Sequence, residues 1–228
     1  MEAVALLSGG RDSLLSACLK IDYGMRIIPV ICYNGHMEGV DRVQFSVNSL
    51  KAKYGDKVGD LVQFHTGMTM HSYLLDFWTN DSYHGCDKIP PLYQIHCLAC
   101  KAAMYAHAIA YCKAKDIRYI IDGMRKSQGF FVDTEIMKSH FSNLCYDQGI
   151  HLITPVYELK SDLDRKRMLS ERGLPTKTLE PQCFLGCPLK KQLTDDDCAE
   201  LEIFYKNCLQ HPVEQSIEDL SISMRWAN

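Results

Sequence analysis

The sequence lacks the features that mark a membrane or secreted protein. None of its apolar runs reaches the roughly 18 to 20 residues that a membrane-spanning helix needs. Met1-Glu2 leads into an apolar, strand-like segment rather than into a charged and then apolar signal. Internal repeats and low-complexity segments are also missing. We therefore expect a cytoplasmic protein with no membrane partner.

Runs of basic residues are absent as well. The 25 lysines and arginines are scattered among 28 acidic residues, which gives a formal net charge of −3 and a sequence pI near 6.3. This distribution argues against a large nucleic-acid footprint. A chain of 228 residues that is 46% hydrophobic is long enough for one substantial core. One globular domain, with a small appended part, is therefore expected.

Without a secretion signal, a disulfide framework is excluded too, so the 11 cysteines are interpreted as reduced thiols. Several lie singly within helix or strand patterns and are expected to fill the core. These are Cys18, Cys32, Cys112, Cys145, Cys198 and Cys208.

Apolar runs bounded by turn residues alternate with helical patterns along most of the chain. Expected strands cover residues 3–7, 26–32, 60–64, 117–121 and 151–153. Expected helices cover residues 12–23, 39–54 and 97–115, and a fourth helix is capped by Ser161 and ends near Gly173, whereas residues 77–96 are expected to be irregular. This alternation predicts an α/β fold with a doubly wound, mostly parallel sheet. Ligands of such sheets bind at the carboxyl ends of the strands.

The strongest motif occupies that position. Ser8-Gly9-Gly10-Arg11-Asp12-Ser13 stands between the first expected strand and the first expected helix. The glycines permit a tight turn, and successive backbone N–H groups, with the hydroxyls of Ser8 and Ser13, face one point and form an anion site. The alternative is an ordinary Gly-Gly turn between a strand and a helix, with Asp12 as the helix cap. Such a turn would not require all six residues of the motif. No Gly-Lys-Ser or Gly-Lys-Thr follows, so the loop is not a Walker A loop.

The motif resembles the PP-loop of the adenine nucleotide alpha hydrolase superfamily of ATP pyrophosphatases, which includes tRNA thiolases, 7-cyano-7-deazaguanine synthase and tRNA lysidine synthetase. The resemblance implies a Rossmann-like fold in which the loop binds the pyrophosphate of ATP and Asp12 lies near Mg²⁺ or the phosphates. Leu7, Tyr33 and Gly123 join residues 8–13 as expected nucleotide-binding residues. The implied chemistry is attack of a substrate oxygen on the α-phosphate, with AMP transfer and pyrophosphate release.

A second element follows the expected strand at residues 117–121, where Asp122-Gly123-Met124-Arg125-Lys126-Ser127-Gln128 stands. The thiolases carry a Gly/Ala-His-x-x-Asp-Asp pattern here, which this sequence lacks. The segment is similar instead to a phosphate-binding element of the sulfurylase and reductase branch. The resemblance thus implies that Arg125 and Lys126 act with Asp12 in catalysis and balance the charge that grows on the leaving pyrophosphate. A solvated basic loop is the alternative.

Two pairs of cysteines have a spacing that suits a metal site. Cys97 and Cys100 are expected to begin a helix, whose dipole favours thiolates, and Cys183 and Cys187 lie on a Gly/Pro-shaped knuckle. By resemblance, four thiolates would bind Zn²⁺, and three would hold a 4Fe-4S cluster with one open iron. The order of the segments along the chain resembles that of the cluster-bearing thiolases. Buried thiols, or a redox pair unrelated to catalysis, are the alternative.

These patterns lead us to expect an enzyme that adenylates a carbonyl oxygen of a nucleobase-like heterocycle and replaces it with sulfur. Nitrogen insertion, tRNA base thiolation and a non-catalytic nucleotide-binding protein with structural zinc stay open. A small planar substrate is favoured over tRNA because no basic surface is visible, and a sulfur or nitrogen donor is a second expected partner. We expect a homodimer, with a PP-loop domain over residues 1–180 and a Cys knuckle and helix over residues 181–228 packed on it.

Overall fold

The computed structural model of the chain describes residues 1–79, 91–184 and 193–226. The strands are β1 (Glu2–Leu6), β2 (Arg26–Tyr33), β3 (Met37–Glu38), β4 (Val62–His65), β5 (Tyr119–Ile121), β6 (His151–Ile153) and β7 (Gln182–Cys183). The helices are α1 (Arg11–Asp22), α2 (Arg42–Tyr54), α3 (Gly67–Thr79), α4 (Leu92–Ala114), α5 (Glu135–Asp147), α6 (Asp162–Ser170), α7 (Asp195–Phe204) and α8 (Gln210–Trp226). Short helical turns are η1 (Gly55–Lys57), η3 (Lys126–Gln128), η4 (Phe131–Asp133) and η5 (Tyr205–Leu209).

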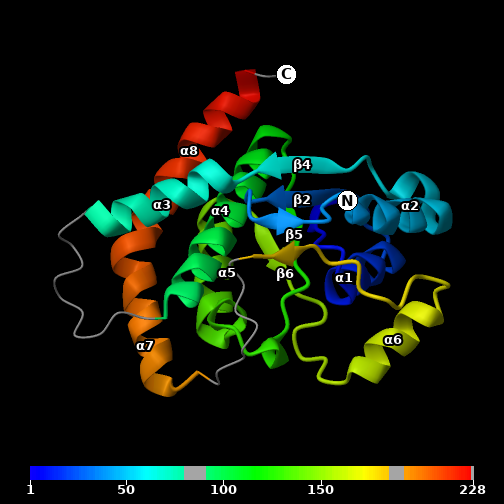
Figure 1. The fold of residues 1–228 in the computed structure, drawn as a ribbon. Helices are drawn as coiled ribbons and strands as arrows, with labels where there is room; N and C mark the ends of the chain where they lie inside the picture. Colours follow the sequence, from blue (N-terminus) through cyan, green and yellow to red (C-terminus); the bar gives the residue numbers. More distant parts are fainter. Residues whose placement is uncertain (80–90, 185–192, 227–228) are drawn as a thin grey trace.

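Five strands form one parallel sheet in the order β4-β2-β1-β5-β6. The central strand β1 is largely apolar, and its alternate residues enter two separate cores on the two sides of the sheet. Val4 and Leu6 belong to one core, whereas Ala3 and Ala5 belong to the other. The predicted α/β fold with a mostly parallel sheet is therefore confirmed (Figure 1). Strand β1 ends where the glycine loop begins.

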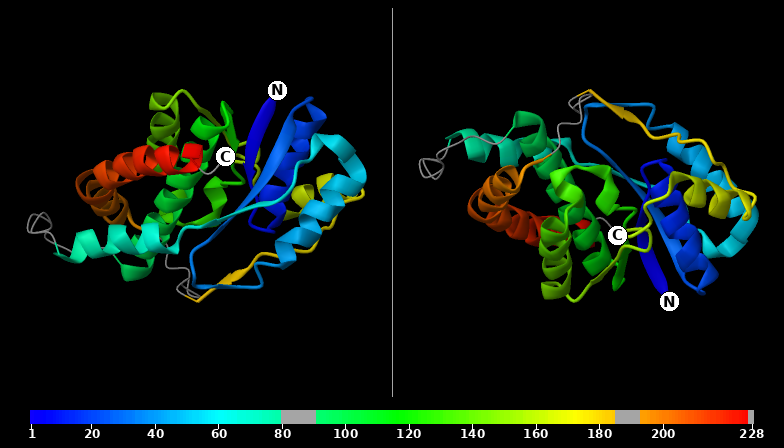
Figure 2. Two further views of the ribbon diagram at one scale, coloured as in Figure 1. Left: turned by 90° about the horizontal axis from the view of Figure 1, so that it is seen from above. Right: turned by 90° about the horizontal axis from the view of Figure 1, so that it is seen from below.

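The two faces of the sheet carry different sets of helices. Helices α1, α2 and α6 pack on one face, and α3, α4, α5, α7 and α8 pack on the other (Figure 2). The long helix α8 lies against α4. None of the helices in the described parts of the chain is both long and apolar enough to span a membrane.

Helices α3 and α5 are not among the elements expected from the sequence, although each has a clear local helix signal. In α3 the buried residues are Met70, Tyr73, Leu74 and Phe77, a spacing that places them on one helix face. Helix α5 is capped by the hydroxyl of Thr134, which accepts from the N–H of Met137. Both helices cover the same face of the sheet.

The start of α4 corrects a prediction about the Cys-x-x-Cys pair. The helix begins at Leu92, so Cys97 and Cys100 lie inside it rather than at its first turn. The free N–H groups and the positive end of the dipole belong to the first turn. The expectation that a helix start would favour thiolates at these positions is therefore wrong.

A small antiparallel ribbon lies outside the main sheet. Strand β3 pairs with β7, with Met37 opposite Cys183 and Glu38 opposite Gln182, and the N–H of Phe184 donates to the carbonyl of His36. This pairing brings the segment that follows α6 back across the sheet edge (Figure 2). We call residues 178–183 the strap.

Candidate functional site

A cavity of about 490 Å³ opens where β1, β2 and β5 end, next to the glycine loop. Its wall is formed by residues of the loop, of α4, of the segment after β5 and of the strap. A volume of this size falls in the range of small-molecule and cofactor sites, roughly 300 to 1,000 Å³. The position agrees with the carboxyl-edge rule for parallel sheets.

The loop over residues 8–13 is held by its own hydroxyl groups. The N–H of Ser8 donates to Oγ of Ser13 at 3.2 Å, the N–H of Gly10 donates to Oγ of Ser8 at 3.2 Å, and Oγ of Ser13 donates to the Gly10 carbonyl at 3.0 Å. Gly9 has φ +77°, in the region that favours glycine. These contacts pre-form the turn that an anion would occupy, which we call the phosphate cradle (Ser8, Gly10, Asp12 and Ser13).

Gly123 supports the cradle from the end of β5. A Cβ at this position would lie 2.4 Å from the backbone N and 2.6 Å from the Cα of Ser13. Both distances are too short for any side chain, so only glycine lets the segment after β5 pack on the start of α1. Gly123 also lines the cavity, as do the expected residues Leu7 and Arg11.

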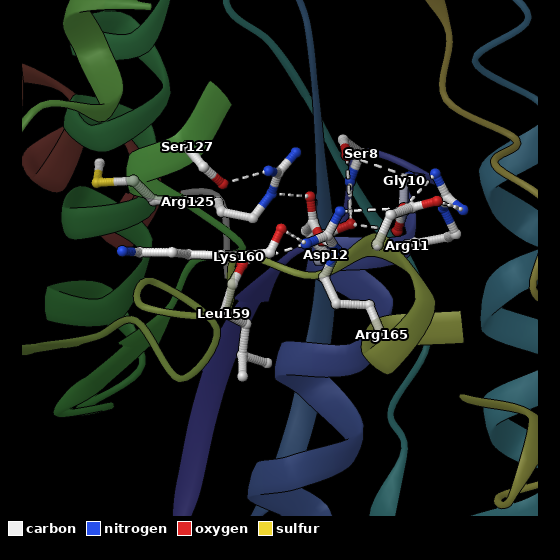
Figure 3. Close-up of polar contacts among 12 residues, drawn as sticks. Ser8, Gly10, Arg11, Asp12, Arg125, Ser127, Leu159, Lys160 and Arg165 are labelled. Carbon is white, nitrogen blue, oxygen red and sulfur yellow. Dashed lines mark hydrogen bonds and ion pairs between the residues drawn. The ribbon is translucent and has the colours of Figure 1, made fainter. Parts of the chain in front are cut away.

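Asp12 joins two arginines that come from distant parts of the chain (Figure 3). Its Oδ2 lies 3.0 Å from Nε of Arg125, and its Oδ1 lies 2.7 Å from Nε of Arg165. The side chains of Asp12, Arg125 and Arg165 are 16%, 16% and 4% exposed, respectively, so water screens these ion pairs little. Asp12 therefore fixes two guanidinium groups beside the cradle.

Arg165 is a site residue that the sequence does not reveal. The pattern at residues 160–165 indicates only a helix start, and Ser161 does cap α6, accepting from the N–H of Asp164 at 3.1 Å. Arg165 turns inward instead, where Nη1 donates to the carbonyls of Leu159 and Lys160. Its contact with Asp12 depends on tertiary packing of α6 on α1, for which no local pattern exists.

Lys126 lies apart from Arg125, its neighbour in the predicted catalytic pair. Its side chain is 55% exposed and 3.8 Å from the surface carboxylate of Glu135, and Lys126 does not line the cavity. Tyr33 also stays outside the cavity wall and packs edge-on against His65. The structure thus brings Asp12 and Arg125 together but separates both Lys126 and Tyr33 from them.

A buried network lies under the cradle. Asp122 accepts from Tyr105 Oη at 2.7 Å and from the N–H of Met124 at 2.9 Å, and Nζ of Lys101 lies 2.7 Å from the same carboxylate. Burial alone would lower the pKa of Lys101, but Asp122 and then Asp133 raise it above its ordinary value. Lys101 therefore stays a cation in the cavity wall.

Asp133 differs from the other acids of the cavity because no hydrogen bond or ion pair joins its carboxylate to another residue of the described chain. Burial, partly opposed by Lys101, raises its pKa to about 7. Its position is fixed, since Tyr157 Oη donates to its backbone carbonyl at 3.0 Å and Thr134, the cap of α5, follows it directly. A buried carboxyl that titrates near neutrality is suited to accept or donate a proton.

The strap places a third acid over the cradle. The N–H of Leu179 donates to the carbonyl of Gly9 at 3.0 Å, and Oε2 of Glu180 lies 3.2 Å from the position that a Cβ on Gly10 would take. Burial raises the pKa of Glu180, and a hydrogen bond with Ser8 partly offsets that rise. No pattern in the sequence marks either strap residue as part of the site.

Four described cysteines line this cavity, and three of them, Cys97, Cys100 and Cys183, form what we call the thiol wall; the fourth is Cys32 of β2. The side-chain amide of Asn34 donates to Sγ of Cys100 at 3.3 Å, and burial raises the pKa of the Cys100 thiol. Among the remaining cavity residues, burial, followed by two neighbouring histidines, lowers the pKa of His96. Cys97, Cys100 and Cys183 thus line the same cavity as the loop, and their role as metal ligands stays a prediction.

The proposed metal centre lacks a complete ligand set in the described structure. Within residues 1–79, 91–184 and 193–226, no group of three or more histidine, cysteine or acidic side chains is arranged to bind a metal ion. Cys187, the fourth expected ligand, lies outside the described residues. The placed thiols alone do not fit a zinc or iron-sulfur centre, so the centre stays a prediction and we assign no chemistry to it.

Comparison with known proteins agrees with this geometry. A family model described as thiamine biosynthesis protein (ThiI) matches residues 1–129, more than half of the chain. A search of curated proteins gives no match. The family match confirms the PP-loop ATP pyrophosphatase superfamily that the loop motif predicted.

Two solved structures are similar over nearly the whole chain. One is a 4-thiouridine synthetase–RNA complex with bound ATP, with a TM-score of 0.65 and 14% identity, covering 97% of this chain and 53% of that one. The other is an NMN synthetase from Francisella tularensis, with a TM-score of 0.57 and 14% identity, covering 98% and 86%. At this identity the likeness shows the fold. The chain spans about half the length of the 4-thiouridine synthetase that it matches.

Proposed function

This chain belongs to the thiamine biosynthesis protein (ThiI) family, and from this premise we propose that it transfers AMP from ATP to a carbonyl oxygen of a nucleobase-like heterocycle and then replaces that oxygen with sulfur. The observation that supports this most is the placement of a PP-loop and three thiols in the wall of one cavity. The cradle supplies the site for pyrophosphate. One thiol of the wall can take sulfur from a sulfane sulfur donor and attack the activated carbon as a persulfide, and a second thiol then releases the product and forms a disulfide that an external thiol reduces.

In the first half-reaction the carbonyl oxygen attacks the α-phosphorus, and the bond from that phosphorus to the oxygen bridging to the β-phosphorus breaks. Arg125 and Arg165, held by Asp12, are suited to stabilise charge on the leaving pyrophosphate. A ring N–H beside the carbonyl must lose its proton as the oxygen becomes nucleophilic. Asp133, with a pKa of about 7, is suited to accept that proton.

In the second half-reaction a sulfur nucleophile adds to the activated carbon, and AMP leaves with the former carbonyl oxygen. Adenylation is useful here because it converts an oxide, which is a poor leaving group, into a phosphate monoester. Mg²⁺ is expected with ATP, and carboxylates of the cavity wall offer the oxygen ligands that it prefers. When bound, it would neutralise phosphate charge.

A free nucleobase or similar small planar molecule is our preferred acceptor. The net charge of −3 and the scattered basic residues offer no extended surface for an RNA backbone. The 4-thiouridine synthetase, in contrast, forms a complex with RNA. RNA is therefore the alternative acceptor, and both classes belong in the same assay.

The test is incubation of the protein with ATP, Mg²⁺, a sulfane sulfur donor and a reducing thiol in the presence of uracil, of uridine or of bulk tRNA. We expect AMP and pyrophosphate in equal amounts, together with an acceptor whose mass shows sulfur in place of oxygen. Gly10→Val is the control variant, because a side chain there would press on Ser8 and Glu180 and block the cradle. Formation of ADP and phosphate would contradict the proposal, and an ammonia-dependent product would indicate nitrogen insertion.

A further inference from the structure

The carboxyl group of Glu180 lies inside the phosphate cradle, where an anionic ligand is expected. It contacts the space over Gly10 and hydrogen-bonds with Ser8. The backbone bond from Leu179 to Gly9 ties the strap to the loop, so the carboxyl is held there by local structure. Once the phosphates of ATP arrive, two sets of negative charge face each other at short range, which is unfavourable even though Glu180 is partly open to solvent.

Glu180 differs from Asp12 and Asp122 in having no ion-pair partner within the described residues. Asp12 is joined to two arginines, and Asp122 is joined to Lys101. No ion pair links Glu180 to any residue in the described parts of the chain, although it lines the cavity and burial raises its pKa. The hydrogen bond with Ser8 and the charge of Lys101 lower the pKa of Glu180 but offset the effect of burial only in part.

We propose that Glu180 is a ligand of the divalent cation that accompanies ATP, so that a cation between its carboxylate and the pyrophosphate oxygens replaces repulsion with attraction. Mg²⁺ is typically held by one or two carboxylates together with substrate phosphates and water, rather than by a cage of protein ligands. A single strap carboxylate is sufficient for such a site. The inference rests on the ATP binding that the proposed function requires.

The experiment measures ATP affinity by titration calorimetry, once with Mg²⁺ and once with EDTA, for the wild type, Glu180→Gln and Glu38→Gln. Glu38 is the matched control, since it is an exposed acid on β3 that pairs with the strap opposite Gln182. We expect Mg²⁺ to tighten ATP binding by about tenfold or more in the wild type and in Glu38→Gln. In Glu180→Gln the two affinities should become about equal, and Glu180→Asp should restore part of the difference.

A second readout uses Mn²⁺ in place of Mg²⁺. The electron paramagnetic resonance spectrum of Mn²⁺ with ATP should change on binding to the wild type and not on binding to Glu180→Gln. Circular dichroism and thermal unfolding establish that each variant is folded.

Three results would overturn the inference. If the ATP affinity of Glu180→Gln depends on Mg²⁺ as strongly as that of the wild type, the cation is held elsewhere. Tighter ATP binding by Glu180→Gln both with Mg²⁺ and with EDTA would show that the carboxylate only competes with phosphate. A wild type that binds no ATP under either condition would overturn the proposed function as well, which separates the two failures.

Discussion

The phosphate cradle and the thiol wall line the same cavity but are built in different ways. Asp12 of the cradle is paired with two arginines, and Gly123 packs without any gap on Ser13. In the thiol wall, burial raises the pKa of Cys100 and so favours its neutral thiol. Cys183 is exposed on the strap. One part is pre-organised by ion pairs and close packing, and the other presents thiols to the cavity.

This difference matches two chemical tasks. Binding pyrophosphate and stabilising its charge require fixed dipoles and cations that need no rearrangement during the reaction. Delivery of sulfur requires a nucleophile that is renewed in each cycle, so its groups cannot be locked in permanent contacts. Variants in the cradle should therefore impair ATP binding or adenylation, whereas variants in the thiol wall should impair only the second half-reaction.

The largest effect is expected for Gly123→Ala. The added methyl group would lie 2.4 Å from a backbone nitrogen, so the segment after β5 must move away from the loop. We expect no measurable ATP binding and a loss of unfolding free energy of about 1 to 3 kcal/mol. Calorimetric titration with ATP and chemical denaturation measure the two effects.

Gly59→Ala is the control for that variant, because its new methyl group would approach nothing closer than 3.4 Å. It should retain ATP binding. Equal ATP affinity in the two variants would mean that the close approach of Gly123 to Ser13 is not what shapes the cradle.

Replacement of Cys100 by Ser should separate the two half-reactions. With a sulfane sulfur donor, sulfur transfer should fall below detection, since serine cannot hold the persulfide sulfur that attacks the activated carbon, while AMP and pyrophosphate formation in a single turnover should stay within about threefold of the wild type. Cys198→Ser is the control, because Cys198 lies on α7 and does not line the cavity. Loss of adenylation together with sulfur transfer would show that the thiol wall is also part of the ATP site.

Asp133→Asn should lower turnover by about a hundredfold, as expected when a general base is removed. The base must be ionised to accept a proton, so wild-type turnover should rise with pH through about 7. Turnover of the variant should lack this rise. A variant with the wild-type pH profile would exclude Asp133 as the proton acceptor.

The raised pKa of Asp133 also predicts how the free energy of unfolding depends on pH. Its folded pKa of about 7 lies above the ordinary value, so its contribution to stability is present below about pH 4 and is lost as pH rises through about 7. The loss corresponds to roughly 4 kcal/mol at about 1.4 kcal/mol per pKa unit. Denaturation at pH 8 should therefore find Asp133→Asn more stable than the wild type, with the difference vanishing near pH 4.

These contrasts also show where sequence reasoning succeeds. The loop at residues 8–13, its position after β1 and the parallel sheet follow from local pattern, since each depends on residues that are adjacent or regularly spaced. Arg165, Glu180 and Asp133 escape such reasoning because their roles arise from the tertiary placement of α6, the strap and η4 around one cavity. Grouping Lys126 with Arg125 reflects adjacency in the chain, which does not determine where two neighbouring side chains point.

The smallest effect is expected for Lys126→Gln, which should leave turnover within about twofold of the wild type. Its side chain is exposed and weakly paired at the surface. Arg125→Gln is the variant to compare with it and should lower turnover by about tenfold to a hundredfold. ATP binding should weaken less, because the contact between Arg125 and the leaving pyrophosphate strengthens in the transition state. Equal losses in the two variants would restore Lys126 to the catalytic group.

The central claim is that the acceptor's carbonyl oxygen becomes the nucleophile and leaves with AMP. An acceptor labelled with ¹⁸O at that carbonyl tests it directly by mass spectrometry of the products. Our account predicts that the label appears in the phosphate group of AMP, in an amount equal to the acceptor converted. Unlabelled AMP beside converted acceptor, or ADP and phosphate in place of AMP and pyrophosphate, would contradict it.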